Sequence, residues 1–87
     1  MSIRALNWAF DQRTIKSTPK FVLVVLADMA DENNSCYPSQ RHIAEKINAG
    51  ERTVRDALTA LENAGLISRE LRYIDDRRTS SRYVLQL

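Results

Sequence analysis

A chain of 87 residues predicts one small domain spanning residues 1–87, because independent domains mostly have about 50–250 residues. Hydrophobic residues at 44%, charged residues at 28% and a net charge of only +2 are typical of a soluble globular protein and exclude disordered, collagen-like and membrane-spanning classes. One cysteine excludes an internal disulfide and, with one histidine, gives no zinc ligand set, so we expect no metal, no cofactor and a reducing, cytosolic setting.

The first predicted element lies within residues 1–12. Ile3, Leu6 and Phe10 recur at helical spacing and predict a short amphipathic helix or arm. Two aromatic side chains of this segment, Trp8 and Phe10, are open to two interpretations. They either extend the core, as small domains often require, or form the contact of a homodimer.

A three-helix core is predicted over residues 18–65. Thr18 is a favourable N-cap, and Pro19 suits the first helical position. The apolar run that begins at Phe21 continues for about 12 residues, which is longer than most strands, so it predicts a helix. The inner face of this helix is predicted to hold Phe21, Val22, Val25, Leu26, Met29 and Ala30.

Two further helices are predicted on either side of a short turn at residues 48–50. Ser39 caps the first of them. Glu51 begins the second, and Gly65 ends it because glycine is favoured directly after a helix. Cys36 lies before them in a short extended piece and is expected to be a small hydrophobe near the first strand. Their inner faces are predicted to hold Ile43, Ala44, Ile47, Val54, Ala57, Leu58, Leu61 and Ala64.

After the third helix the apolar period changes from 3.6 to 2, which predicts a β-hairpin over residues 66–87. The connection from Asp75 to Ser81 is polar and long, and we expect it to project into solvent. The whole positive excess of the chain lies in residues 71–87, and a local basic patch suits a polyanion, although a solvated loop of mixed charge is the alternative. The inward-facing strand residues are predicted to be Ile67, Leu71, Tyr73, Tyr83, Leu85 and Leu87.

The order of helix, short extended piece, helix, tight turn, helix and hairpin describes a winged helix-turn-helix, an α+β fold that is mostly α. Residues 38–47 are similar to the second helix of bacterial and phage helix-turn-helix proteins, and residues 50–62 resemble their recognition helix. Residues 19–28 resemble their first helix, and residues 65–67 the step into the wing. The tryptophan-containing residues 4–10 resemble the N-terminus of replication initiators of phages and mobile elements.

This resemblance implies a sequence-specific binding domain for double-stranded DNA. Its role is then origin recognition in replication initiation by a phage or mobile element, with replication proteins as possible partners. The alternative within the same fold is a transcription regulator. Either role implies a bacterial cytoplasm and association with the nucleoid. A homodimer would read two half-sites.

The outward face of the third helix, opposite Val54 and Leu58, is predicted to carry the base contacts. Arg52 and Arg55 each suit a bidentate contact with guanine. Asp56 suits a cytosine amine or the orientation of an arginine. The other predicted contacts of this helix are Thr53, on the flank and suited to a phosphate, and Thr59, on the outward face.

The same helix allows a different interpretation. Glu51 with Arg55 and Arg52 with Asp56 are spaced i, i+4, so each pair suits an ordinary surface ion pair. The acidic residues of the segment 51–64 outnumber its basic residues, which lowers the expected attraction to phosphates. The alternative function is therefore a winged-helix protein–protein interaction module without DNA readout.

Further contacts are predicted outside the recognition helix. Arg77 and Arg78 in the wing suit the minor groove or its phosphates. The start of the second helix favours a phosphate because its backbone N–H groups and dipole point outward. The residues predicted there are Ser39, Gln40 and Arg41.

Catalysis is not expected. The sequence contains no glycine-rich phosphate loop, no nucleophile elbow and no Ser/His/Asp set, and a domain of this size has little interior for a substrate pocket. His42 is expected at the surface or half-buried, without a metal. We expect no small-molecule substrate and no membrane partner.

Overall fold

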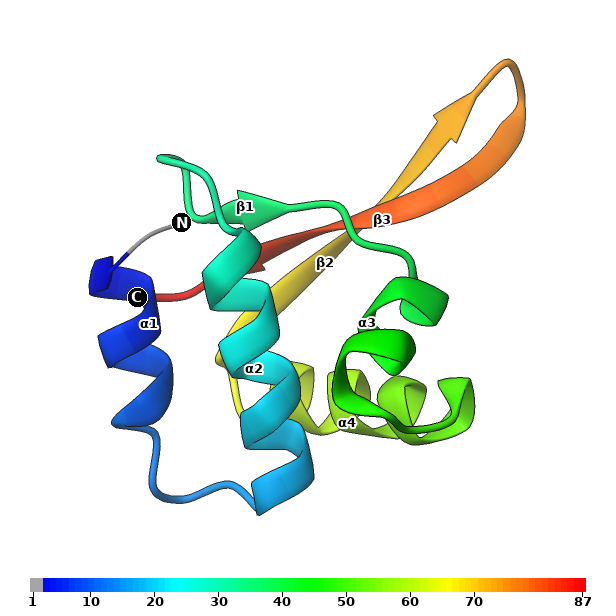
Figure 1. Ribbon diagram of the computed structural model, residues 1–87. Coiled ribbons are helices and arrows are strands. Elements are labelled where there is room, and N and C mark those ends of the chain that lie inside the picture. Colours follow the sequence, from blue (N-terminus) through cyan, green and yellow to red (C-terminus); the bar gives the residue numbers. More distant parts are fainter. Residues whose placement is uncertain (1–2) are drawn as a thin grey trace.

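The computed structural model describes residues 3–87, with the backbone alone described for Arg78. Within this range four helices lie on one side of a three-stranded antiparallel sheet, whose strand order is β1-β3-β2 (Figure 1). The elements in chain order are α1 (Ile3–Phe10), α2 (Ser17–Met29), β1 (Ser35–Cys36), α3 (Gln40–Ile47), α4 (Glu51–Asn63), β2 (Ile67–Ile74) and β3 (Arg77–Leu85).

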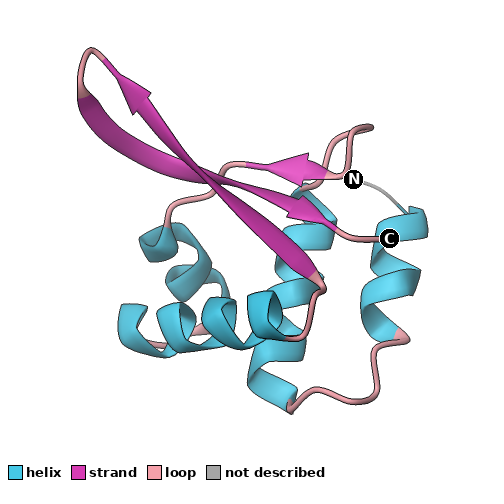
Figure 2. Ribbon diagram, turned by 180° about the vertical axis from the view of Figure 1, so that it is seen from behind, coloured by secondary structure: helices cyan, strands magenta, loops and turns pink. Residues whose placement is uncertain are grey.

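Helix α2 is the centre of the helical layer. It packs against α1, α3 and α4, and its end reaches β1 and β3 (Figures 1 and 2). Contacts on several sides widen its buried stripe, so Leu23 and Ala27 are buried although they lie outside the predicted inner face. Phe21 was predicted to be internal and is half exposed, which corrects that prediction. The remaining predicted residues of this face are buried or half-buried: Val22, Val25, Leu26, Met29 and Ala30.

Helix α1 is present as predicted, but its buried face differs. Ala5 and Ala9 are fully buried, because these small side chains let α1 lie close to α2. Ile3 and Phe10, predicted to face inward, are 71% and 58% exposed. Trp8 is half-buried and packs against the core, so the interpretation of Trp8 as a core extension fits its surroundings.

The start of α2 also differs from the prediction. The helix begins at Ser17, one residue before the expected N-cap Thr18, and its N-cap is Lys16, whose side chain makes no cap hydrogen bond. Pro19 therefore lies inside the first turn. It is tolerated there because the amide groups of the first turn have no acceptor within the helix.

Ser39 caps α3 as predicted. Its Oγ accepts a hydrogen bond from the backbone N–H of His42 at 3.0 Å. We expect Ser39→Ala to lower the free energy of unfolding by about 1 kcal/mol, because one amide of the first turn loses its acceptor. Urea unfolding of the free protein measures this loss. Ser17→Ala is the control, since its side chain lies in the first turn of α2 and is not its N-cap, and an equal loss in both variants would contradict the capping role.

Gly65 ends α4 in a Schellman motif. The N–H of Gly65 donates to the carbonyl of Glu62 at 3.0 Å, and the N–H of Leu66 donates to the carbonyl of Leu61 at 3.1 Å. Gly65 has a φ of +74°, a conformation that glycine adopts without steric cost. Ala64, predicted to face inward, is exposed because it lies at the end of the helix.

The hairpin turn is much shorter than predicted. β2 ends at Ile74 and β3 begins at Arg77, so the expected loop from Asp75 to Ser81 is a two-residue turn. Asp75 and Asp76 have φ values of 52° and 61°, the positive values that a type I′ turn requires at both central positions. Aspartate tolerates this conformation better than most residues, so the turn forms without glycine.

The outer half of the hairpin projects beyond the helices (Figure 1). No helix covers it, so Leu71 and Tyr73 are exposed although their alternation predicted an inward face. Leu87, also predicted to be internal, is exposed after the end of β3. Closer to the helices, Tyr83 and Leu85 are buried as predicted.

Strand β1 joins the sheet at β3, where Cys36 pairs with Tyr83. Cys36 is buried, as predicted for a small hydrophobe beside a strand, and burial together with the charge of Asp31 raises the pKa of its thiol to about 12. Arg82 connects all three strands. It donates to Ser35 Oγ at 2.8 Å and to Glu70 Oε2 at 3.0 Å. The arrangement is the predicted winged helix-turn-helix, with a third strand added.

Candidate nucleic-acid interface

Helices α3 and α4 pack against each other across the short turn at residues 48–50. Asn48 has a left-handed conformation with a φ of 56°, and the N–H of Ala49 donates to the carbonyl of Ala44 at 3.0 Å. Gly50 is the N-cap of α4. The turn therefore directs the chain from one helix straight into the next and leaves the first turn of α4 at the surface.

The outer face of α4 agrees with the helical wheel. Val54 and Leu58 are fully buried and hold the helix against the core. Positions 52, 56, 59 and 63 are separated by four, three and four residues, so their side chains form one stripe along the helix. The exposed residues of this stripe are Arg52, Asp56, Thr59 and Asn63.

The ion pairs that offered the alternative interpretation of α4 are not formed. Among the residues that the structure describes, neither Glu51 and Arg55 nor Arg52 and Asp56 have a nitrogen–oxygen distance of 4.0 Å or less, so neither pair forms an ion pair. The guanidinium of Arg52 is thus available to an external acceptor. Thr59 is partly committed, because its Oγ1 donates to the backbone carbonyl of Arg55 at 3.1 Å.

The two flanks of the α4 stripe lie beside different elements. On one flank, Thr53 and Asp56 border a hollow of about 240 Å³ together with Thr18 and Pro19 at the start of α2. On the other flank, Arg55 lines a pocket together with residues at the start of α3 and in the hairpin. Thr53 and Arg55 therefore lie beside different elements, although both belong to α4.

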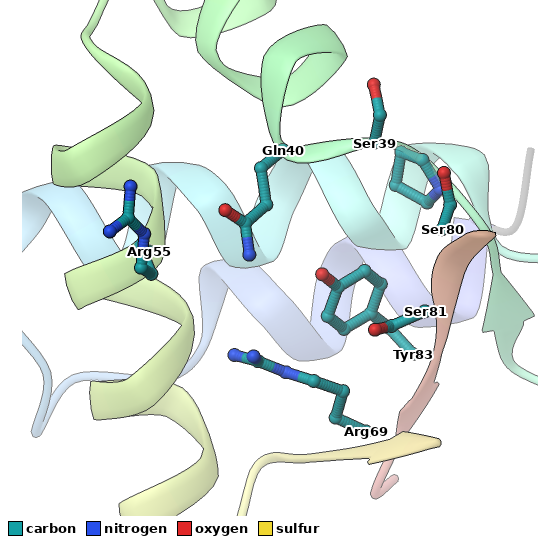
Figure 3. Close-up of a pocket in the computed structure, with 8 residues that line it drawn as sticks. Ser39, Gln40, Arg55, Arg69, Ser80, Ser81 and Tyr83 are labelled. Atoms are coloured by element: carbon teal, nitrogen blue, oxygen red, sulfur yellow. The ribbon is translucent and has the colours of Figure 1, made fainter. Parts of the chain in front are cut away.

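A polar pocket of about 370 Å³ lies between the start of α3, α4 and the hairpin. We call it the α3–wing pocket. Figure 3 shows the side chain of Arg69 extending from β2 toward α4, with the Gln40 amide and the Tyr83 hydroxyl facing the same space. The residues that line this pocket are Pro38, Ser39, Gln40, Arg55, Arg69, Ser80, Ser81 and Tyr83.

Arg69 was not predicted as a site residue. Its side chain is only 18% exposed, and its Nη2 lies 3.0 Å from Oε1 of Glu62. This contact is an ion pair without hydrogen-bond geometry, and within the described part of the chain Nε of Arg69 has no acceptor. The available sequence signal was an arginine two residues after Ile67, at a strand position that alternation assigns to the core.

Tyr83 forms the floor of the pocket. Burial raises the pKa of its hydroxyl, and the positive charge of Arg69 with hydrogen bonds from Gln40 and Ser81 partly opposes that rise. The guanidinium carbon of Arg69 lies 5.7 Å from the centre of the Tyr83 ring. The tyrosine therefore stays neutral and offers the pocket a hydroxyl, not a negative charge.

The start of α3 brings only part of the predicted set to the pocket. Ser39 and Gln40 line it, and Ser39 Oγ is already engaged in the helix cap. Arg41 points to solvent and forms an exposed ion pair with Glu45 at 3.3 Å. The helix start therefore contributes Ser39 and Gln40 to the same pocket as Arg55.

The basic patch predicted from the end of the chain is smaller than its arginines imply. Arg82 is held by Glu70, and Arg72 stacks on the ring of Tyr37 at 4.5 Å. Arg77 is exposed directly after the hairpin turn, and the side chain of Arg78 lies outside the described residues. The formal charges of Arg77 and Arg78 near the tip are balanced by those of Asp75 and Asp76.

Comparison with known proteins agrees with this geometry. A family described as a helix-turn-helix domain matches residues 12–67, which is more than half of the chain and runs from before α2 to the start of β2. The chain belongs to this helix-turn-helix family. The match includes the α3–turn–α4 unit and the whole of the exposed α4 stripe.

One curated relative of this helix-turn-helix domain is Protein YmfN of Escherichia coli (strain K12). The two are 39% identical over 51 residues, which is 59% of this chain and 11% of YmfN. The helix-turn-helix domain thus matches only a small part of that relative. No solved structure matches the chain at a significant level.

No helix in the described part of the chain is long and apolar enough to span a bilayer. No group of three or more histidine, cysteine, aspartate or glutamate side chains is placed to hold a metal ion in that part of the chain.

Proposed function

We propose that this helix-turn-helix domain binds double-stranded DNA sequence-specifically, with α4 as the recognition helix in the major groove. The observation that carries the proposal is the exposed stripe of α4, where Arg52 and Asp56 face solvent and form no ion pair with each other. A helix enters the major groove with such a face, and an arginine fork matches guanine. Membership of the helix-turn-helix family supports the same function.

The proposed contacts divide into two kinds. Arg52 and Asp56 read base edges, and Thr59 presents its methyl group and hydroxyl oxygen beside them. The remaining contacts position the domain on the DNA backbone without reading sequence. They are Thr53 and Arg55 on the flanks of α4, Ser39, Gln40 and Arg41 at the start of α3, and Arg77 and Arg78 in the wing.

Selection from random duplex DNA, followed by binding to the winning site at several salt concentrations, tests this function. A clear motif with a steep salt dependence is the expected result, because phosphate contacts release counterions. No enrichment and weak binding at low salt would contradict it and favour a protein-interaction module. A palindromic motif would add a homodimer, for which the exposed Phe10 offers an apolar contact.

We further propose that the recognised site belongs to a replication origin of a phage or mobile element. The support is the resemblance of residues 4–10 to replication initiators. Deleting the selected motif from its natural DNA separates this role from transcription control. Loss of replication is the expected result, and an unchanged copy number with altered transcription would identify a regulator.

Substituting the wing arginines tests their proposed anchoring role. Arg77→Ala combined with Arg78→Ala should weaken binding to matched and mismatched DNA by the same factor. The slope of log K against log salt should fall by up to about 1.8, since each neutralised phosphate contributes about 0.9. Arg13→Ala, an exposed arginine between α1 and α2, is the control. A changed base preference in the double variant would instead make the wing a reader of sequence.

A further inference from the structure

We propose that the α3–wing pocket holds one phosphate of the DNA backbone, with Arg69 as its principal ligand and Arg55 as the second. This inference rests on the proposed function and deepens it. It assigns a DNA contact to a strand residue that no recognition-helix pattern includes. It also assigns Arg55, on the flank of α4, to the DNA backbone and leaves base reading to Arg52 and Asp56.

The position of Arg69 is the first argument. Ile67 and Arg69 lie on the same face of β2, and their partners on β3 are the buried Leu85 and Tyr83. An apolar side chain suits such a core-facing position, because a desolvated guanidinium is unfavourable unless its donors are all satisfied. Arg69 occupies it with one ion pair and with Nε free of an acceptor among the described residues.

The second argument is the sheet irregularity beside Arg69. Glu70 pairs with Arg82 and Arg72 pairs with Thr79, so Ser80 and Ser81 on β3 oppose the single Leu71 on β2. A bulge of this kind re-aims side chains and often lies next to a functional site. Here both serines line the pocket into which Arg69 extends (Figure 3).

The chemistry of the lining identifies the ligand class. Arg55 and Arg69 line the space together with the neutral side chains of Gln40, Ser81 and Tyr83, and no carboxylate is among the described residues that line it. Guanidinium forks match the oxygens of a phosphate. A volume of about 370 Å³ leaves room for a phosphodiester with part of its sugars.

The location of the pocket identifies the source of that phosphate. Arg55 lines the pocket and lies three residues after Arg52, so the two side chains leave neighbouring turns of α4. A duplex whose base edges meet Arg52 therefore carries its backbone past the pocket. Phosphate contacts fix the register of a protein on DNA in this way.

The test uses the whole chain and a duplex that carries the selected motif, in which single phosphates are replaced one at a time by neutral methylphosphonates. For wild type, one position close to the bases read by Arg52 should weaken binding several-fold. For Arg69→Gln, the same replacement should have no further effect. The salt slope of Arg69→Gln should be lower by about 0.9, which is about a 3.5-fold smaller loss of affinity between 50 and 200 mM salt.

Two further variants separate contact from folding. Arg55→Gln changes an exposed side chain and should be insensitive to replacement of the same phosphate, although its fold is unaffected. Arg13→Gln makes the same change of charge away from the pocket and should keep the wild-type response at every phosphate. Thermal unfolding of each variant shows that the protein remains folded under the binding conditions.

The outcomes separate the pocket from the proposed function. If Arg69→Gln and each phosphate replacement act additively while the motif is still selected, the pocket assignment is overturned and DNA reading by α4 stands. If wild type selects no duplex, both fail. Binding of inorganic phosphate seen at the Arg69 Nε–H signal by NMR, without duplex binding, would assign the pocket to a free phosphorylated ligand and overturn its role on DNA.

Discussion

Leu58→Ala lowers the free energy of unfolding by about 3 kcal/mol, because the substitution leaves a cavity under α4 that its neighbours only partly fill. Leu58 is 0% exposed and belongs to the face that packs α4 against α2 and the rest of the core. Domains have a total stability of roughly 5–15 kcal/mol, so this one change removes a large share of it. The melting temperature should fall by roughly 12–24 °C.

The chain provides a matched control for this loss. Leu71 is 55% exposed on the projecting part of β2, so Leu71→Ala makes the same chemical change without opening a cavity. Its effect on unfolding should stay within about 0.5 kcal/mol. Chemical denaturation of both variants under the same conditions gives the comparison. Equal losses would mean that Leu71 is covered in solution, for example by self-association, and a loss that shrinks on dilution would identify that case.

Arg52→Ala removes discrimination at one base pair and lowers affinity for the selected motif by roughly 5–150-fold, the range of about 1–3 kcal/mol for a bidentate contact. The reason is specific to this side chain. Arg52 is exposed at the N-terminal end of the α4 stripe and does not pair with Asp56, so the folded protein loses no internal ion pair with it. Stability should therefore remain within about 0.5 kcal/mol of wild type.

Competition binding with every single-base variant of the motif measures the effect. Wild type should prefer one base at the position that Arg52 contacts, and Arg52→Ala should bind all four bases there about equally. Arg4→Ala, on the exposed side of α1, should leave both affinity and preference unchanged. A uniform weakening across all sequences with a flatter salt slope would make Arg52 a phosphate contact and move base reading elsewhere on α4.

The helices and the ends of α3 and α4 could be predicted from sequence because their signals are local, whereas the start of α2 differs from the prediction. Ser39 caps α3 through an amide three residues away, and Gly65 takes the one conformation that ends α4. The 3.6-residue period identified Val54, Leu58 and Leu61 as buried, and it follows that the opposite side of α4 is exposed. The predicted base contacts share this basis, and their roles stay predictions.

The wing was predicted less well, because its details depend on contacts between segments. The turn at Asp75 and Asp76 uses a left-handed backbone conformation that aspartate tolerates. An aspartate pair does not by itself predict that conformation. Leu71 and Tyr73 alternate like core residues and yet extend past the helices that would have covered them. The apolar spacing of α1 failed for a related reason: the face that packs against α2 buries Ala5 and Ala9 and leaves Ile3 and Phe10 exposed.

By itself the sequence determined that the chain forms a helix-turn-helix followed by a hairpin, since periodicity, caps and turns act between residues a few positions apart. Only the tertiary structure decided which polar side chains meet. Gln40, Arg55 and Arg69 come from a helix start, a second helix and a strand, and packing alone brings them to one pocket. From the alternation of the sequence alone, Arg69 occupies a strand position that faces the core. It becomes an anion ligand in our proposal because the bulge in β3 and the flank of α4 leave a polar space in front of its guanidinium.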